Sequence, residues 1–514
     1  MTSRIGARDL LDVVVDPGSW RSWDSEPLPP PVLSAAYAAD LAAARAKTGL
    51  DESVLSGEAT IGGRRVAIVA CEFAFLAGSI GVAAAERLVV AVERATAERL
   101  PLVASPTSGG TRMQEGTIAF LQMVTISAAV ARHKQAGLPY LVYLRDPTTG
   151  GVFASWGSLG HVTAAQPGAL VGFLGPRVFS AIYGQDFPAG VQVAENLYRH
   201  GLLDAVVPPE QLAEVAARAL DVLLAPGETY RPARHPACQP ARPAASATAA
   251  EQTEEVPDIP AWDSITRTRR PDRPGVRELL RRGANDVTPL HGTGEGENEP
   301  GLILALARFG SAPCILLGQD RRFASRRHPL GPAGLRAARR GLRLAGELNL
   351  PMVTVVDTAG AALSREAEEG GLAGEIARCL AEFVLVGAPT VCLLLGQGAG
   401  GGALALLPAD RVLCAQHAWL SPLPPEGASA ILYRTVDRAA EIAAAQGVRS
   451  RDLRNAGIVD RIIPERPDAA DEPLEFLQRL SGVLESEINA LLAADATQRR
   501  ADRLRRYRRL GRPS

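Results

Sequence analysis

A glycine-rich turn in the first part of the chain has residues that could stabilise negative charge on an oxygen atom. Gly109 and Gly110, with Thr111 and Arg112 after them, follow the apolar run 102–104 and precede a helical pattern. Because glycine has no Cβ, backbone N–H groups can converge at such a turn, and the start of a helix adds partial positive charge. A carbonyl oxygen that gains charge could be held there, although glycine pairs at turns are more often structural.

A second glycine pair follows the next strand-like run, at 140–144. Gly150 and Gly151 are followed by Val152, and the pattern predicts that the segment 146–155 enters a helix. No histidine, aspartate or cysteine stands out as a catalytic acid or nucleophile. Backbone N–H groups are therefore the chemical feature that the two turns share.

The same order of features returns in the second half of the chain. Gly360 follows Gly110 by 250 positions, and the segment 401–403 corresponds to 150–152. Self-similarity of this kind is typical of internal duplication. The chain is therefore interpreted as two diverged copies of one domain.

Each copy contains two strands, a helix, a strand and a second helix, in that order. The second copy shows this with strand patterns at 302–307, 314–317 and 352–356, and with a helical pattern over 332–348. Crossover helices of this kind require parallel pairing and a sheet buried on both faces. These elements predict an α/β fold.

The composition indicates a large protein without a strong charge bias. Its 514 residues suggest two to four domains, 46% of them are apolar, and the net charge is −1. That charge gives no reason to expect nucleic acid or an anionic membrane as a partner. A stretch rich in proline, alanine, arginine, serine and glutamate predicts a linker over 225–261, between domains 1–224 and 262–514.

The cysteines and the N-terminus favour a cytoplasmic protein. Six cysteines are scattered without a Cys-x-x-Cys pair, which is typical of reduced thiols in the cytosol. Asp12 interrupts the short apolar run 10–15, so neither a signal peptide nor a membrane span is expected there.

Two groups of arginines have both a structural and a functional interpretation. The first group is Arg321, Arg322, Arg326 and Arg327, and the second is the eight arginines between 499 and 512. The first is either a solvated loop or a contact for an anionic cofactor such as the phosphates of coenzyme A. The second predicts a solvated helix end.

Several motifs resemble the two subunits of the carboxyltransferase of bacterial acetyl-CoA carboxylase. Segments similar to the β subunit are 108–116, 146–155 and 172–178, and segments similar to the α subunit are 396–405 and 425–432. The chain thus resembles a β–α fusion of the biotin-dependent acyl-CoA carboxylase family. The resemblance covers 10–208 and 262–464.

The resemblance implies two tandem crotonase-type ββα spiral domains with one oxyanion hole each. It places the holes around Gly151 and Val152 in the first half, and around Gly402 and Ala403 in the second. The residues that it implies for substrate or cofactor binding are Gly109, Gly110, Thr111, Arg112, Gly150, Gly175, Arg177, Gly360, Gly401, Leu404 and Ala405. Family β subunits usually begin with a four-cysteine zinc ribbon, but no cysteine precedes Cys71, so no metal is expected.

The activity that the resemblance implies is carboxyl transfer from N-carboxybiotin to a short acyl-CoA, with acetyl-CoA as the first candidate. In the family's mechanism carboxybiotin releases CO2, the biotin anion removes the α-proton of the thioester, and the enolate captures the CO2. Neither lysine lies beside a methionine, as a biotinylated lysine would, so biotin is expected on a separate carrier protein, loaded by a biotin carboxylase. A homodimer or a larger homo-oligomer is expected.

One departure from the family pattern leaves two alternatives open. The α subunit's loop usually reads Asp-Thr-Pro-Gly-Ala-Tyr, whereas the segment 357–362 here has alanine in place of both the proline and the tyrosine. The first alternative is a decarboxylase of malonyl or methylmalonyl thioesters, since the same enolate forms in either direction. The second is a non-catalytic subunit that binds an acyl-CoA.

Overall fold

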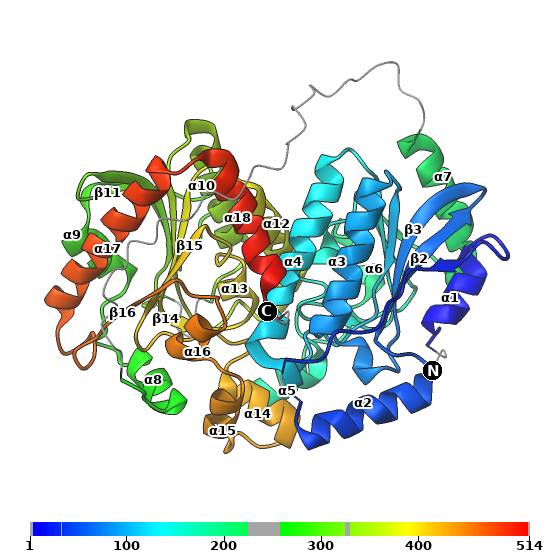
Figure 1. Cartoon of the computed structure of the whole chain (residues 1–514), viewed down its shortest axis with the longest axis horizontal. Helices are drawn as coiled ribbons and strands as arrows, with labels where there is room; N and C mark the ends of the chain where they lie inside the picture. Colours follow the sequence, from blue (N-terminus) through cyan, green and yellow to red (C-terminus); the bar gives the residue numbers. More distant parts are fainter. Residues whose placement is uncertain (1–3, 32, 225–256, 324–328, 512–514) are drawn as a thin grey trace.

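The chain folds into two lobes, each built on one seven-stranded sheet. The computed structural model describes residues 4–31, 33–224, 257–323 and 329–511. Figure 1 shows the two lobes side by side, with the first half of the chain in blue to green and the second in green to red. Most of the predicted linker, 225–256, lies outside the described residues.

The first sheet has the strand order β1-β2-β3-β4-β5-β7-β9. Its strands are β1 (Arg21–Ser22), β2 (Val54–Ile61), β3 (Arg64–Cys71), β4 (Leu102–Ser105), β5 (Tyr140–Leu144), β7 (Val162–Ala165) and β9 (Ala205–Val206), and β6 (Thr148–Thr149) pairs separately with β8 (Val171–Gly172). The α-helices of this half are α1 (Ala7–Val14), α2 (Ala35–Thr48), α3 (Val82–Ala97), α4 (Gly116–Gln135), α5 (Pro176–Tyr183), α6 (Ala194–Arg199) and α7 (Leu212–Leu223).

The second sheet has the order β10-β11-β12-β13-β14-β15-β16. Its strands are β10 (Asn285–Leu290), β11 (Leu302–Phe309), β12 (Ala312–Gln319), β13 (Met352–Thr358), β14 (Thr390–Gly398), β15 (Arg411–Ala415) and β16 (Arg461–Ile463). The α-helices are α8 (Ala261–Thr268), α9 (Val276–Gly283), α10 (Pro332–Leu348), α11 (Arg365–Glu369), α12 (Leu372–Leu385), α13 (Gly400–Leu404), α14 (Pro425–Tyr433), α15 (Ala439–Ala445), α16 (Ser450–Asn455), α17 (Pro473–Ala493) and α18 (Ala496–Arg509).

The two sheets share one pairing pattern, and it confirms the predicted fold class. An antiparallel hairpin, β2–β3 or β11–β12, leads into strands that pair in parallel. Helices cover both faces, so strands such as β4 are apolar at every position except the last: Leu102 and Ala104 pack on the side of α3 and α4, and Val103 packs on the side of α1 and α7. Each half is thus an α/β domain of the predicted spiral type.

Equivalent helices of the two halves pack against each other at the junction. Helix α4 contacts α12, and α5 contacts α14, as Figure 1 shows for α4 and α12 at the centre of the molecule. Helix α4 is buried around almost its whole circumference, which suits a helix between a sheet and a second domain. These two pairs of helices determine how the loops of one half meet those of the other.

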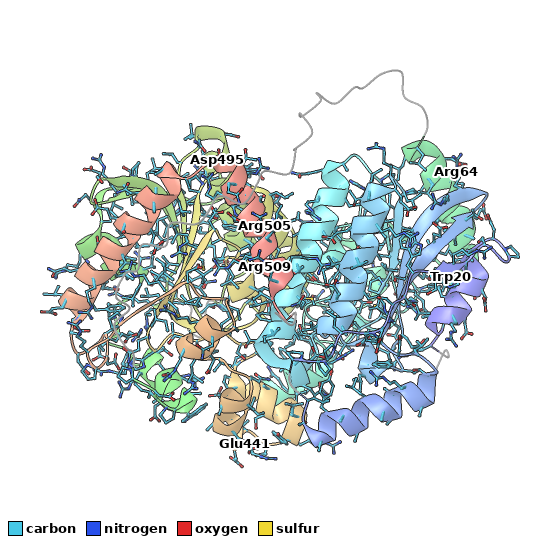
Figure 2. The ribbon with its side chains drawn as sticks, in the orientation of Figure 1. Trp20, Arg64, Glu441, Asp495, Arg505 and Arg509 are labelled. Atoms are coloured by element: carbon cyan, nitrogen blue, oxygen red, sulfur yellow. The ribbon has the colours of Figure 1, made fainter. Side chains whose placement is uncertain are left out.

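The arginine-rich tail differs from the prediction of a solvated helix end. It forms α18, on which Figure 2 labels Asp495 at the start and Arg505 and Arg509 further along. The guanidinium of Arg503 is buried and lies 2.6 Å from the carboxylate of Asp410. Arg508 pairs with Glu86 of α3, in the first half. Arg503 and Arg508 are five residues apart and therefore lie on different sides of the helix, so that one pairs within the second half and the other pairs with the first half.

The described cysteines are buried and form no disulfide. The five cysteines of the described residues are free and buried, while Cys238 lies outside those residues. Burial raises the pKa of Cys71 to about 11 and that of Cys314 to about 12, so both remain protonated at neutral pH. Within the described ranges, no helix has the length and apolar character needed to cross a bilayer.

Candidate functional site

A cavity of about 860 Å³ lies between the two halves, and the glycine turns of both halves line it. The glycines from the first half are Gly109, Gly110, Gly150, Gly151 and Gly175, and those from the second are Gly360, Gly400, Gly401 and Gly427. Residues about 250 positions apart in the chain thus face one space. The packing of α4 on α12 and of α5 on α14 brings them there.

Both turns of the first half contain a glycine with a positive φ angle, and at Gly150 a close contact with the other turn also excludes a side chain. Gly150 has φ +68°, and a Cβ on it would lie 3.1 Å from the Cα of Gly110. Gly110 itself has φ +113°, and its N–H donates to Ser108 Oγ at 2.9 Å. A side chain at Gly150 would therefore be both strained and in contact with the neighbouring turn.

The second half repeats these contacts with an offset of 250 positions. The N–H of Gly360 donates to Thr358 Oγ1 at 3.1 Å, as that of Gly110 does to Ser108. Gly400 has φ +62°, close to the value at Gly150. The two halves therefore share the hydrogen bond at Gly110 and Gly360 and the backbone conformation at Gly150 and Gly400, although an α-helix follows directly only in the second half.

Three consecutive backbone N–H groups of the first half, those of Gly151, Val152 and Phe153, have no acceptor among the described residues. The N–H of Gly150 donates to the carbonyl of Phe173 at 3.0 Å. Within the part of the chain that the structure describes, no hydrogen bond is made by the N–H groups of Gly151 and Val152. Since buried N–H groups are nearly always paired, a ligand oxygen is the natural acceptor for them.

The corresponding N–H groups of the second half belong to the first turn of α13. Ala399 and Gly400 donate to the carbonyls of Thr358 and Ser421, which leaves Gly401 and Gly402 without an acceptor within the helix. Ala403 is the first residue of α13 with an intrahelical acceptor. We therefore correct the predicted match of 401–403 with 150–152: Gly400, not Gly401, corresponds to Gly150. Three consecutive glycines made the register ambiguous in the sequence, and the positive φ of Gly400 resolves it.

The predicted helical entry at 146–155 is also wrong. Residues 150–155 form turns, followed by a short 3-10 helix at Trp156–Ser158. Ser155 Oγ donates to the carbonyl of Gly151 at 2.5 Å, and the N–H of Gly157 donates to Val152 at 2.9 Å. A serine hydroxyl that takes a backbone carbonyl in this way competes with helix formation.

The predicted binding residues are placed differently with respect to the cavity. Besides the glycines named above, Thr111 and Leu404 line it. The predicted site residues that are buried and are not part of its lining are Val152, Gly402, Ala403 and Ala405. Arg177 lies in α5, and its side chain is outside the described part of the structure.

Arg112 does not face the cavity, in contrast to the expectation of a substrate contact. Its guanidinium is 1% exposed and bonds both carboxylate oxygens of Glu52, one of them at 2.9 Å. Glu115 completes this cluster, with an oxygen 3.6 Å from Arg112. Arg112 thus ties the glycine turn to Glu52 and Ser79, on the side away from the cavity.

The cavity wall is mostly apolar and contains one ion pair. The apolar side chains that line it include Met113, Phe120, Phe173, Leu174, Val178, Leu363, Ile376, Leu404, Leu423, Ile431 and Val436. Arg269 and Glu426 also line it, and their nearest atoms are 2.6 Å apart. No motif in the sequence marks Arg269 or Ile376, because residues far from the glycine motifs along the chain become their neighbours only in the folded protein.

The two described arginines of the predicted cluster, Arg321 and Arg322, are engaged within the second half. Arg321 donates to the carbonyls of Thr268 and Arg270 and lies 3.4 Å from the carboxylate of Asp357. Arg322 pairs with Glu278. Arg326 and Arg327 lie outside the described residues, so the interpretation as a coenzyme A contact stays a prediction.

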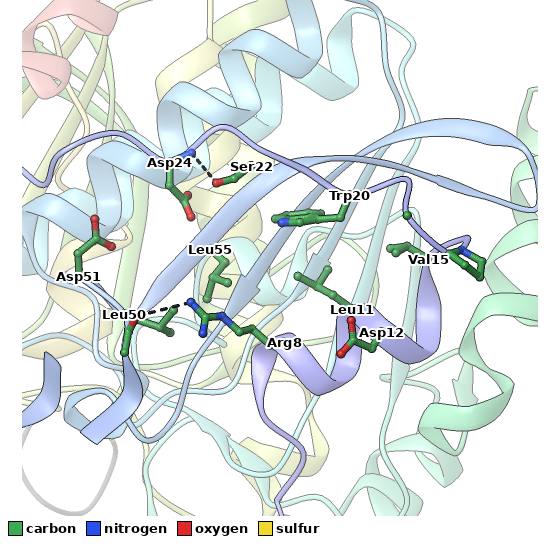
Figure 3. Close-up of a pocket in the computed structure, with 13 residues that line it drawn as sticks. Arg8, Leu11, Asp12, Val15, Trp20, Ser22, Asp24, Leu50, Asp51 and Leu55 are labelled. Atoms are coloured by element: carbon green, nitrogen blue, oxygen red, sulfur yellow. Dashed lines mark hydrogen bonds between the residues drawn. The ribbon is translucent and has the colours of Figure 1, made fainter. Parts of the chain in front are cut away.

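A second cavity, of about 820 Å³, lies near the N-terminus and contains none of the predicted site residues. Figure 3 shows its wall, formed by Arg8, Leu11, Trp20 and Leu55 among others, with Asp12, Asp24 and Asp51 around it. Asp24 and Asp51 are both close to Arg87. In the described ranges no group of three or more histidine, cysteine, aspartate or glutamate side chains could hold a metal ion.

Comparison with known proteins agrees with these observations. Residues 3–501 match the model of the carboxyl transferase domain family. The chain is 61% identical over 511 residues to a probable biotin-dependent acyl-coenzyme A carboxylase beta3 subunit of Mycobacterium tuberculosis, covering 99% of each chain. It is 37% identical over 520 residues to the acetyl-coenzyme A carboxylase carboxyl transferase subunits beta/alpha of Salinispora tropica, covering 99% of this chain and 91% of that one.

Among solved structures, transcarboxylase 12S matches with 18% identity and a TM-score of 0.38, over 96% of this chain and 91% of that one. The family match and the 61% identity extend over almost the whole chain, through both glycine turns. The chain therefore belongs to the carboxyl transferase domain family, as a carboxyltransferase component of the biotin-dependent acyl-coenzyme A carboxylases.

Proposed function

We propose that this protein transfers the carboxyl group of N-carboxybiotin to a short acyl-CoA, with acetyl-CoA as the first candidate and a malonyl-CoA-type product. One observation supports the proposal: each half brings to the wall of the same cavity a glycine, Gly151 or Gly401, whose backbone N–H has no acceptor in the half's own structure, and the N–H of the next residue, Val152 or Gly402, has none either. Carboxyl transfer between a ureido group and a thioester develops negative charge on two oxygens. Two such pairs of donors are what this reaction needs.

The donors act because they are fixed in place before the reaction begins. The N–H pairs of Gly151 with Val152 and of Gly401 with Gly402 are held by glycine turns with defined hydrogen bonds. A preorganised donor of this type typically contributes about 3 kcal/mol to lowering a barrier. The apolar wall strengthens the effect because it excludes water from the charged oxygens.

The side chains around the cavity fit a reaction without a protein base. Arg269 and Glu426 are the charged residues of the lining, and each has the other as an ion-pair partner. When bound, carboxybiotin would supply both the carboxyl group and the base. We assign Gly151 and Gly401 to the two oxygens, and Leu404, which lines the cavity, to contact with an acyl chain.

We further propose that biotin comes on a separate carrier protein, loaded by a biotin carboxylase, and that the protein works in the cytoplasm as a homodimer or larger assembly. The names of both relatives support an acyl-CoA carboxylase subunit. Only the Salinispora name specifies acetyl-CoA. Acetyl-CoA specificity is for this reason the part of the proposal that most needs an experiment.

The experiment is to mix the protein with carboxylated biotin carrier protein and a panel of acyl-CoA thioesters, and to measure the carboxylated products by mass spectrometry. Malonyl-CoA formed from acetyl-CoA supports the proposal in full. Another carboxylated acyl-CoA corrects the acyl specificity. CO2 release from malonyl-CoA without biotin would identify a decarboxylase instead, and acyl-CoA binding without any turnover would identify a non-catalytic subunit.

A further inference from the structure

The segment 172–175 lies between the two glycine turns and touches both. The carbonyl of Phe173 accepts the N–H of Gly150 at 3.0 Å, next to the unpaired N–H of Gly151. The ring of the same residue lies against Gly401 of the other half, where a Cβ would come within 2.9 Å of it. The position of this one residue therefore affects the donors of both halves.

A buried carboxylate from the second half holds the other side of this segment. Glu368 of α11 is 6% exposed, and its oxygens accept the N–H of Phe173 at 2.8 and 3.0 Å. The N–H of Leu174 donates to it at 3.4 Å, and Gln192 Nε2 donates at 2.6 Å. Three donors of the first half thus converge on one carboxylate of the second, which itself does not line the cavity.

We infer that Glu368 is a positioning residue: its ionised carboxylate fixes the Phe173 segment and thereby the donor turns of both halves. A carboxylate offers two acceptor oxygens, whereas the protonated acid or an amide turns one of them into a donor or a weaker acceptor. Loss of the charge would release the segment on its α11 side. The inference depends on the proposed function only for its catalytic readout.

The charged neighbours of Glu368 are engaged with other partners. On α11, Arg365 pairs with Glu369, and His200 of the segment after α6 lies 3.7 Å from Glu369 as well. On the opposite side Arg336 of α10 pairs with Glu375 of α12. The groups that act on Glu368 are therefore neutral: burial raises its pKa to about 7, against the lowering effect of Gln192 and the two N–H groups.

The matched variants are Glu368→Gln and Glu369→Gln, adjacent residues on the same helix. Glu369 also reaches the first half, where it accepts Asn196 Nδ2 at 3.0 Å, but it does not touch the Phe173 segment. Hydrogen–deuterium exchange of the peptide 170–176 at pH 8 tests the positioning without any substrate. We expect about tenfold faster exchange in Glu368→Gln and no change in Glu369→Gln.

The catalytic test is the ratio of the wild-type kcat to the kcat of each variant as a function of pH. For Glu368→Gln this ratio should be at least about tenfold above pH 8 and should approach one below about pH 6, where the wild-type carboxyl is protonated. Glu368→Asp, which keeps a carboxylate, should lose less protection from exchange. The ratio for Glu369→Gln should stay near one throughout.

Equal exchange of 170–176 in wild type and Glu368→Gln would overturn the inference, and so would a kcat ratio that does not depend on pH. A similar loss in both variants, in parallel with a lower Tm, would show a merely structural role and would also overturn it. If the wild type transfers no carboxyl group to any acceptor, the proposed function fails, while the exchange experiment still decides the role of Glu368.

Discussion

Replacing Gly150 by alanine should damage catalysis far more than it damages the fold. An L-residue at φ +68° costs about 1–2 kcal/mol in backbone strain. The new Cβ would also lie 3.1 Å from the Cα of Gly110 and 3.3 Å from the carbonyl oxygen of Gly109, so the two turns must separate. That movement displaces the N–H groups of Gly151 and Val152, and the loss of one such donor raises a barrier by about 3 kcal/mol, or about a hundredfold in rate.

A control with the same strain separates these two effects. Gly168 has φ +69°, almost the value at Gly150, and a Cβ there would meet nothing within 4 Å. Gly168→Ala should therefore lose a similar amount of stability and keep its kcat within about twofold. The assay is carboxyl transfer to acyl-CoA together with urea denaturation of both variants. Equal activity of Gly150→Ala and Gly168→Ala would refute the assignment of the Gly151 turn as an oxyanion site.

Three further predictions concern buried charges and thiols. Arg503→Leu should lower the free energy of unfolding by about 3–5 kcal/mol, measured by urea denaturation, because it leaves the carboxylate of Asp410 buried without its cation. Arg505→Leu, at an exposed pair on the same helix, should change it by less than about 1 kcal/mol. Burial raises the pKa of Glu368 from 4.5 to about 7. The bound proton therefore stabilises the folded protein fully below about pH 4.5, and this stabilisation is lost as the pH rises through about 7. The free energy of unfolding should change by about 3 kcal/mol over this range, and Glu368→Gln should abolish the change. Cys71 and Cys314 should resist alkylation at pH 8 until the protein unfolds, and mass spectrometry of native and denatured samples checks this. Rapid modification of either thiol in the native protein would contradict its burial.

The elements with strong local signals were predictable. The helix predicted over 332–348 is α10, and the strand predicted over 352–356 is β13, which continues to Thr358. Glycine pairs indicated the turns because positive φ angles favour glycine over other residues. The tail was mistaken for a solvated helix, since the sequence does not show that the carboxylates of Asp410 and Glu86 lie beside its arginines.

The residues that shape the site without carrying a motif were not predictable. Glu368 and Arg269 each stand in a short run rich in charged residues, 365–369 and 267–270, and their roles come from neighbours in distant segments. Arg112 was next to the glycine pair in the sequence, but the backbone direction turns its side chain toward Glu52 and away from the cavity. The position of Arg112 close to the glycine pair along the chain did not predict a position in the cavity wall.

The duplicated α/β architecture and the kind of chemistry could be inferred from the sequence, because glycine has no Cβ and adopts the positive φ angles at which neighbouring N–H groups can converge on one oxygen. Which N–H groups remain available, and that Gly151 and Gly401 line one cavity, follow from the folded chain alone. The direction of an N–H depends on φ and ψ, as the one-residue shift from Gly401 to Gly400 shows. The distance between turns 250 residues apart depends on how α4 packs on α12 and α5 on α14.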